Sequence, residues 1–565
     1  MVAKALNRVI IYIFSTLIII SCGTASKSVD SGETGSAPAR QSSGGLADEI
    51  RTLTESGILS SMLHALEIIR SNNLSHVEFG RLMTGVNILL IKLVYPDSPA
   101  QLPAIDLPQT AGYTRIIREA EKGNYVRPSG NSSDFFEHIL PFLSINDESS
   151  SEVLQNALTD MDKAFTLRPR SVLPPLFQGF IYERMGNLRN AETAYRKAYE
   201  ISAECYPARM GIARVRRLSG NAREAVALFS ELAINHPDSM EIRRQLAISL
   251  FENNELSRAL TAVDEILRTE PRNGDFLLIR AAILIEQGQF TQANASLDIF
   301  ASINQNHRSY LYMRARVQAE GNRNRDSALN YLRSILRTDP NDIEAMVYAA
   351  TLLMESPRSA DQTEGREFLE LLRRTAGSSV QVLSLGLRDA IQRENWQEAQ
   401  GYLNRVLAVR RTVQDLTDGY HVERGLGNNA RALTYAREIY DRDTSNNDYI
   451  VIYISALIDN NRRDDASRMI ENRINSVSSG AVKSRYFFLR SRLQTNQDAA
   501  LNDLRSSLFE DPRNLDALIA SFLIYHNRRE ERRAVYYLRQ ALAISPDHPQ
   551  LRRYEREYAS LLGRN

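Results

Sequence analysis

A period of 34 residues runs through most of this 565-residue chain and limits what the chain can fold into. Two series of alanines have this spacing: Ala157, Ala191, Ala225, Ala259 and Ala293, and later Ala432, Ala466, Ala500 and Ala534. Between the two series, Ala328, Gly365 and Ala399 keep the count after insertions of one and three residues. Prolines keep the same interval, or twice it, at Pro169, Pro237 and Pro271 and again at Pro512 and Pro546. Such a period predicts a repeat protein, in which each unit buries its apolar face against the next.

A pair of antiparallel helices explains the residues within one period. In residues 172–204, Gly179 belongs to the first expected helix, and Ala191 and Tyr195 belong to the second. Two helices can cross closely only where their side chains are small, which accounts for Gly179 and Ala191. Gly186 marks the turn, because glycine adopts backbone angles that other residues resist. The period therefore predicts consecutive helix hairpins.

These positions resemble those of the tetratricopeptide repeat family. The matching residues are Gly179, Tyr182, Ala191, Tyr195 and Ala198 in one copy and Ala213, Ala225, Phe229 and Pro237 in the next. The resemblance covers residues 138–546 and implies an all-α, right-handed α-solenoid of about twelve hairpins. Late copies depart from the family pattern, because Ile454, Phe488 and Phe522 replace a small residue of the first helix. An armadillo-type solenoid is the alternative fold, but its repeat is longer.

The two ends of the repeat region are expected to differ from its middle. Residues 46–137 do not keep the period and form either degenerate repeats or a separate N-terminal helical module. Helices are expected there near residues 46–70, 75–94, 110–122 and 132–144. Residues 547–565 are expected to form a C-terminal helix that caps the last hairpin. Its apolar stripe consists of Leu551, Tyr554, Tyr558, Leu561 and Leu562.

The first 45 residues are typical of an exported, lipid-anchored protein. Residues 1–21 begin with basic side chains and continue into an apolar run, as a signal peptide does. The end of this run resembles the lipobox of bacterial lipoproteins, which implies that Cys22 is acylated and that the protein faces the periplasm from a membrane of the cell envelope. Residues 22–45 are expected to be a flexible tether, and Gly23 favours the outer membrane slightly. The alternatives are an uncleaved anchor and an ordinary signal followed by a coincidental cysteine.

No motif for catalysis or metal binding is apparent in the sequence. The eight histidines are scattered, and none has metal-ligand spacing with another histidine or a cysteine. Residues 425–430 imitate a dinucleotide-binding loop, but they fall where the period requires a turn. Cys205 is expected to fill space in the core rather than to act as a nucleophile. We therefore expect no enzymatic activity, catalytic residue, metal or cofactor, and the formal charge of +1 argues against nucleic acid as a partner.

The family resemblance implies a function in binding proteins or peptides. In tetratricopeptide proteins, the first helix of each hairpin lines a concave groove that receives the partner. Carried over by position, the groove residues here are Phe180, Met210, Arg214, Arg217, Arg244, Phe251, Tyr312, Arg316, Met346 and Tyr420. Arginines among aromatic side chains suit an acidic or C-terminal peptide, because a guanidinium group binds a carboxylate through two hydrogen bonds. The competing interpretation is that these arginines pair with aspartates and glutamates of the chain itself.

Two functions from different classes are consistent with this sequence. The first is a lipid-anchored scaffold of the cell envelope that binds other proteins, in outer-membrane or secretion-complex assembly. The second is an accessory periplasmic subunit that captures a small ligand for a transport system.

Overall fold

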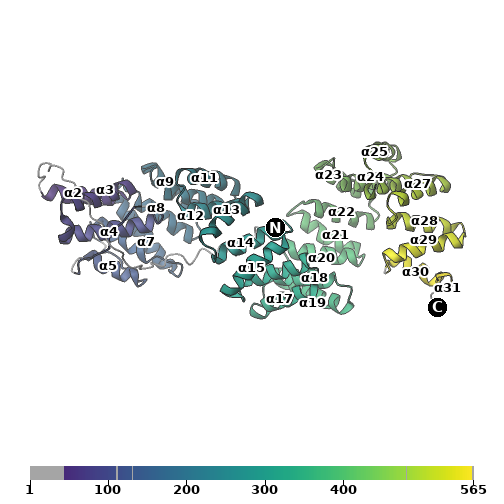
Figure 1. Cartoon of the computed structure of the whole chain (residues 1–565), viewed down its shortest axis with the longest axis horizontal. Coiled ribbons are helices and arrows are strands. Elements are labelled where there is room, and N and C mark those ends of the chain that lie inside the picture. The colour runs from purple at the N-terminus through teal and green to yellow at the C-terminus, as the bar shows by residue number, and fades with distance from the viewer. Residues whose placement is uncertain are drawn as a thin grey trace. The chain divides into compact units, whose positions relative to one another are not determined.

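The computed structural model describes residues 43–562 except residues 99, 110, 111, 130, 479 and 547 (Figure 1). These described residues are arranged in helices and contain no strand, which confirms the predicted all-α fold. They fall into two compact units, one that ends at Thr338 and one that begins at Asp339. The signal segment and Cys22 lie outside the described residues, so the lipid anchor stays a prediction.

The first unit begins with an irregular helical region and continues as hairpins. The N-terminal region consists of α2 (Ser43–Ser56), α3 (Leu59–Ser71), the 3-10 helix η1 (Leu74–His76), α4 (Glu78–Val94), α5 (Gly112–Glu121), α6 (Phe135–Ile139), the 3-10 helix η2 (Leu140–Ser144) and α7 (Ser151–Leu167). The hairpins are α8 (Leu173–Arg184) with α9 (Leu188–Ile201), α10 (Tyr206–Leu218) with α11 (Ala222–Asn235), α12 (Met240–Glu252) with α13 (Leu256–Thr269), α14 (Gly274–Glu286) with α15 (Phe290–Asn304), and α16 (Arg308–Arg316) with α17 (Arg325–Thr338). A π-helical turn, η3 (Val317–Gly321), extends α16.

The second unit consists of hairpins and two short terminal helices. Its hairpins are α18 (Ile343–Met354) with α19 (Ser359–Ala376), α20 (Val380–Gln392) with α21 (Trp396–Leu407), α22 (Val413–Gly425) with α23 (Asn429–Arg442), α24 (Asn447–Asp459) with α25 (Arg463–Ser476), α26 (Ala481–Ser491) with α27 (Gln497–Glu510), and α28 (Leu515–Asn527) with α29 (Glu531–Ile544). The terminal helices are α30 (Pro549–Glu557) and α31 (Ala559–Leu562). The hairpins of the two units together are close to the number that the period predicts.

The structure explains the period at two positions of most hairpins. The alanines of both 34-residue series are buried, and all except Ala157 lie on the second helix of a hairpin. The turn between the helices repeatedly holds a residue with positive φ, at Gly186 (71°), Gly220 (86°), Asn254 (62°) and Gly288 (71°). Glycine and asparagine tolerate this left-handed conformation better than other residues, and it ends the first helix. The glycine-containing segment 425–430 lies at such a turn, between α22 and α23, as predicted.

Tyr195 shows how tightly the first hairpins pack. A Cβ atom added to Gly179 in α8 would lie 2.4 Å from the ring of Tyr195 in α9. A Cβ atom added to Gly211, in the following first helix α10, would lie 2.6 Å from the same ring. The ring therefore occupies the space that two glycines leave free, and α8, α9 and α10 pack closely around it.

The N-terminal region shares one hydrophobic core with helices α7 to α10. The Tyr95 hydroxyl donates a hydrogen bond to the carbonyl oxygen of Gly57 (3.1 Å), and the Tyr95 ring packs edge-on against Tyr206 at the start of α10. Asp97 accepts a hydrogen bond from Ser239 Oγ (2.6 Å), the residue that caps α12. The N-terminal region thus contacts the beginnings of successive first helices.

One helix expected in this region is divided. The single helix predicted near residues 46–70 is wrong, because α2 and α3 are separated at Gly57, where φ is 73°. A Cβ atom at Gly57 would lie 2.4 Å from Leu173 Cγ, so the break lets the chain approach the start of α8. The other expected helices correspond to η1 with α4, to α5, and to α6 with η2.

The C-terminal cap also differs from the single helix that the apolar stripe predicts. Its residues form α30 and α31, which are interrupted at Tyr558. Leu551 and Tyr558 are buried in the core of α27 to α29, and the Tyr558 hydroxyl lies 2.7 Å from His526 Nδ1. Leu561 points out of this core and is 48% exposed, which interrupts the predicted stripe. The bend allows Tyr558 to reach His526.

No helix in the described part of the chain combines the length and the apolar character that a membrane crossing needs.

Candidate partner-binding site

The ten groove residues lie on first helices, as the repeat pattern predicts, and they are divided between the two units. Eight belong to the first unit and two, Met346 and Tyr420, belong to the second. The buried members of the set are Met210, Arg217, Phe251, Met346 and Tyr420. These five side chains are largely enclosed by their own units. Phe180, Arg214, Arg244, Tyr312 and Arg316 are half-buried.

The predicted groove arginines are engaged by carboxylates of the chain itself. Arg214 Nε lies 2.5 Å from Glu183 Oε1, and Arg217 Nη1 lies 2.8 Å from Glu252 Oε1 in a pair that is almost fully buried. Arg244 is paired with Glu270, and Arg316 is paired with Glu286 (2.6 Å) and Glu320 (2.7 Å). The competing interpretation, pairing within the chain, therefore describes these four arginines. Whether any of the ten residues binds a partner stays a prediction.

Burial and neighbouring charges shift pKa values in the Arg214 and Arg217 pairs, and the two effects oppose each other. Burial alone would lower the pKa of Arg214, but the charges of Glu183 and Tyr195 outweigh it, and the pKa is raised. Burial raises the pKa of Glu252, and the nearby Arg217 opposes this shift. Reversing the charge of either arginine would place two carboxylates together in a buried site, so these residues cannot be changed without cost to the fold.

Two observations concern metal-ligating and nucleophilic side chains in the described residues. No group of three or more metal-ligating side chains occurs among them. Cys205 is fully buried just before α10, and burial raises the pKa of its thiol to about 11, which keeps it protonated near neutral pH. This agrees with the prediction that Cys205 fills space in the core.

A cavity of about 580 Å³ lies in the second unit, between α19, α20 and α21. Its lining consists of Arg373, Gly377, Val382, Leu383, Glu398, Gly401, Tyr402 and Arg405. Helices α19 and α21 are the second helices of consecutive hairpins, and α20 begins between them. The cavity therefore lies at positions that the sequence analysis did not assign to a binding groove. One signal for it was present in the sequence: Gly401 stands in the middle of a helix, where a Cβ atom would meet nothing within 4 Å.

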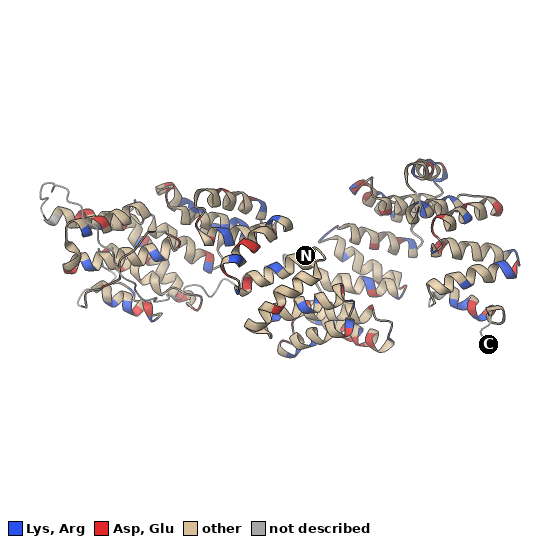
Figure 2. Cartoon of the chain, viewed as in Figure 1, with Lys and Arg blue, Asp and Glu red and all other residues tan. Residues whose placement is uncertain are grey.

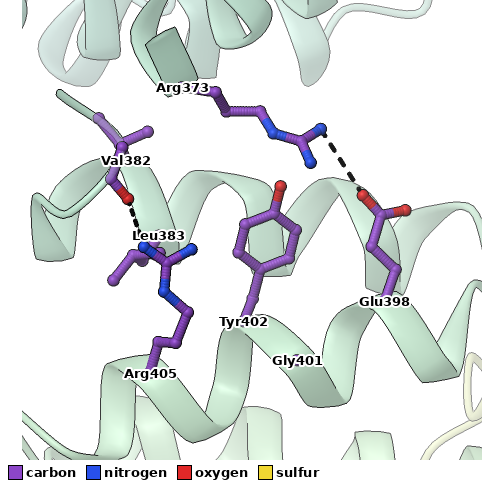
Figure 3. A pocket seen from close by; sticks show the side chains of 8 residues that line it. Arg373, Val382, Leu383, Glu398, Gly401, Tyr402 and Arg405 are labelled. Carbon is purple, nitrogen blue, oxygen red and sulfur yellow. Dashed lines mark hydrogen bonds and ion pairs between the residues drawn. The ribbon is translucent and has the colours of Figure 1, made fainter. Parts of the chain in front are cut away.

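Two arginines and one glutamate supply the charge of this cavity (Figure 3). Arg405 Nη2 donates a hydrogen bond to the carbonyl oxygen of Gly377 (2.8 Å). Arg373 Nη1 lies 3.8 Å from Glu398 Oε1, and its guanidinium carbon is 5.4 Å from the centre of the Tyr402 ring. Basic and acidic residues are interspersed over the helices of both units (Figure 2).

Tyr402 forms part of the cavity wall and has an unusual hydroxyl group. Its ring packs over Gly386 in α20, where a Cβ atom would lie 2.6 Å from the ring. The residue is 7% exposed, and its hydroxyl oxygen is buried without a hydrogen-bond partner. Figure 3 shows this hydroxyl pointing toward Arg373. Burial raises the pKa of Tyr402, and the charge of Arg373 opposes the shift, so the hydroxyl remains a proton donor.

Two family models, both described as tetratricopeptide repeat, match parts of the chain. One matches residues 176–205, which include most of α8 and α9, and the other matches residues 244–303, which include much of α12 to α15. No curated protein sequence matches the chain.

Solved structures with similar folds share little sequence with this chain. The Cut9 and Hcn1 hetero-tetramer of the APC/C is 13% identical and covers 92% of this chain and 96% of its own, with a TM-score of 0.40. Yeast Tom70 is 13% identical, and the match covers 80% of this chain and 95% of the Tom70 chain, with a TM-score of 0.34. PilF from Pseudomonas aeruginosa is 16% identical, and the match covers 43% of this chain and 100% of the PilF chain, with a TM-score of 0.33.

The family matches fall on hairpins that repeat the same small residues and the same turn conformation at the same interval. Residues 176–205 and 244–303 therefore match the tetratricopeptide repeat family, and they lie within a longer run of helix hairpins.

Proposed function

We propose that this protein is a lipid-anchored scaffold of the cell envelope that binds other proteins through its tetratricopeptide hairpins. The run of hairpins in each unit carries this proposal, because stacked hairpins expose extended helix surfaces that repeat proteins use for binding. A role in assembling an outer-membrane or secretion complex accounts for both a membrane anchor and a partner-binding body.

The anchor is supported by the sequence alone. Residues 1–21 have the character of a signal peptide, and Cys22 follows them at a lipobox-like sequence. Several acyl chains at Cys22 would hold the protein on a membrane more firmly than a single chain. Cells that produce the chain should incorporate labelled fatty acid into it, and the Cys22→Ala variant should lose this label. Cys205→Ala is the matched control and should keep it; label retained by Cys22→Ala would refute the anchor.

Crosslinking in intact cells tests the scaffold function. The full chain with Cys22 retained should crosslink to one or a few proteins of the envelope reproducibly. The Cys22→Ala variant should lose those partners that lie at the membrane. If the wild-type chain yields no specific crosslinked protein under conditions that capture a known envelope complex, the scaffold proposal fails.

The cavity favours a second candidate, the capture of a small ligand by an accessory periplasmic subunit. Its volume of about 580 Å³ lies within the range of about 300–1,000 Å³ that is usual for small-molecule sites. Native mass spectrometry of the chain purified from its own cells should then detect a bound molecule of constant mass. This bound mass should disappear when Gly401→Trp fills the cavity.

A further inference from the structure

We propose that the cavity between α19 and α21 binds an acidic side chain in an extended segment of a partner protein. An apolar side chain next to the acidic one would lie against Val382 and Leu383 in the cavity wall. This inference rests on the proposed scaffold function and adds the chemistry of the partner. It places the contact on second helices, away from the groove residues that the repeat pattern assigns to first helices.

Arg405 provides the positive charge for this contact. Its guanidinium group is exposed and donates one hydrogen bond, to the carbonyl oxygen of Gly377. Among the described residues it forms no ion pair with a carboxylate, unlike the four groove arginines. The remaining N–H groups of Arg405 can therefore bind an incoming carboxylate through two parallel hydrogen bonds.

The one acidic side chain of the lining does not cancel this charge. Glu398 already lies 3.0 Å from Arg393, which is outside the lining, and it accepts a hydrogen bond from Asn395 (2.9 Å). Arg373 lies 3.8 Å from Glu398 and is also paired with Glu370 of α19, outside the lining, at 2.8 Å. Arg405 is therefore the lining residue whose positive charge favours an anion.

The N-terminus of α20 also favours an anion in the cavity. This 13-residue helix begins at Val380, and the side chain of its N-cap residue, Ser379, accepts no hydrogen bond from a backbone N–H of the first turn but donates one to Gln381 Oε1 (3.4 Å). The unpaired N–H groups of a first helical turn carry partial positive charge and stabilise nearby anions. Val382, in that turn, belongs to the cavity lining.

The hydroxyl group of Tyr402 is the second independent feature that points to a ligand. It is buried without a hydrogen-bond partner and points toward Arg373 (Figure 3). A buried hydroxyl without a partner destabilises the state that contains it, and a polar ligand atom within reach would remove that cost. A carboxylate is suited to this position because it only accepts hydrogen bonds, and Tyr402 can donate one.

The shape of the cavity favours a protein segment over a free acid. A single carboxylate would fill only part of about 580 Å³, and the lining combines the charged groups with Val382, Leu383 and the face of Tyr402. Gly401 leaves open space above α21, so a main chain can approach the helix there. An acidic side chain beside an apolar one uses both parts of the lining.

Fluorescence anisotropy with a labelled peptide tests this proposal. The probe is acetyl-Gly-Leu-Glu-Leu-Gly-amide carrying a fluorescent group, and its match is the same peptide with Gln in place of Glu. The full chain, purified in mild detergent, should bind the Glu peptide about tenfold more tightly than the Gln peptide, because only the former supplies a carboxylate to Arg405. This preference should weaken as the salt concentration rises.

Matched variants locate the binding. Arg405→Glu should weaken binding of the Glu peptide by about tenfold or more, and Gly401→Trp should abolish it by filling the cavity. Arg374→Glu is the control, because Arg374 is exposed on the same helix as Arg373 but does not line the cavity. It should change the affinity by less than about twofold, as expected for a distant surface charge. Arg405→Gln, checked by circular dichroism, replaces Arg405→Glu if the latter disturbs folding.

Several outcomes would overturn the proposal. They are equal binding of the Glu and Gln peptides, no measurable binding of either, an equal loss in Arg374→Glu and Arg405→Glu, and binding that requires a free peptide C-terminus. Equal affinity for N-acetylglutamate amide alone would replace the partner segment with a small acidic ligand. In cells, a wild-type chain that crosslinks to proteins while Arg405→Glu and Gly401→Trp retain every partner would refute this site and leave the scaffold function intact.

Discussion

Tyr195 in α9 and Tyr402 in α21 lie one position apart in the register of the repeat and make the same kind of ring contact, but their hydroxyl groups have different surroundings. Each ring packs over a glycine of the preceding first helix, Gly179 or Gly386. The Tyr195 hydroxyl donates a hydrogen bond to Glu183 (2.8 Å) and accepts one from Arg214 (3.2 Å). The Tyr402 hydroxyl is buried without such a partner, and the Tyr402 side chain forms part of the cavity wall.

The comparison separates the packing of a hairpin from its polar contacts. The contact between a glycine and an aromatic ring recurs, one residue out of register, because it sets how closely two helices cross. The polar groups around the ring do not recur: Glu183 stands eight residues before Ala191, whereas Ile391 stands eight residues before Ala399. A hairpin can therefore keep its packing while it loses the hydrogen bonds that close its surface.

The largest expected effect follows from removing the charge beside Tyr195. Arg214→Met should lower the free energy of unfolding of α8 to α11 by about 2–4 kcal/mol, because it leaves the largely buried carboxylate of Glu183 without its partner. Arg405→Met, at the cavity, should change the stability of α20 and α21 by less than about 0.5 kcal/mol. Hydrogen exchange measured on peptides from these helices reports both values. Similar losses at the two sites would contradict the comparison.

A smaller difference is expected between the two glycines. Gly179→Ala should destabilise its hairpin by about 1–3 kcal/mol, because the Tyr195 ring is also held by Gly211 and cannot move away. Gly386→Ala should cost less, since the Tyr402 ring can shift toward the cavity. Thermal unfolding of the two single variants, followed by hydrogen exchange in each hairpin, compares them. A larger loss for Gly386→Ala would show that the cavity gives the ring no freedom.

Removing the hydroxyl group of each tyrosine should change stability by different amounts. Tyr195→Phe should lose about 1–2 kcal/mol, because Glu183 and Arg214 each lose a buried hydrogen bond. Tyr402→Phe should be neutral within about 0.5 kcal/mol, or slightly stabilising, because the hydroxyl it removes has no partner. Denaturant unfolding of both variants measures the two changes. A clear loss in Tyr402→Phe would mean that its hydroxyl is hydrogen-bonded in solution.

The smallest effect on stability is expected for a cysteine variant at the cavity, Gly401→Cys. Its rate of thiol labelling can be compared with that of the buried Cys205. In the Cys22→Ala background, Cys205 should react with a thiol reagent at pH 8 only as fast as its surroundings unfold, because it is buried and its pKa of about 11 leaves almost no thiolate. Gly401→Cys places a thiol at the cavity and should react far faster. Above about pH 9, the stabilisation from keeping Cys205 protonated should decline as the pH approaches 11. Rapid labelling of Cys205 in the folded chain would contradict the close packing of the first unit.

The sequence predicts much of the fold because the period acts within each hairpin. The spacing of Ala191, Ala225 and Ala259 places a small side chain at every helix crossing, and all three are buried. The same reasoning fails where long-range contacts decide the outcome. The break at Gly57 depends on Leu173, and the break at Tyr558 depends on His526, residues that lie far away in the sequence or on another helix.

The candidate site could be predicted only in part. Position in the repeat correctly placed the ten groove residues on first helices, but it could not show that Arg217 has a buried partner in Glu252, 35 residues later. Nor could it find the cavity, whose lining comes from α19, α20 and α21 together. Gly401 was the one local sign, and a glycine in a helix has several explanations.

By itself, the amino-acid sequence determined that this protein consists of helix hairpins with small residues at their crossings and a glycine or asparagine at many of their turns. These features depend on steric limits between residues close in the chain, which a sequence displays directly. Only the tertiary structure decided which arginines are neutralised, as Arg214 is, and which are left without an ion pair, as Arg405 is among the described residues. Charge pairing depends on the distance between side chains from different helices, and that distance is set when the hairpins pack.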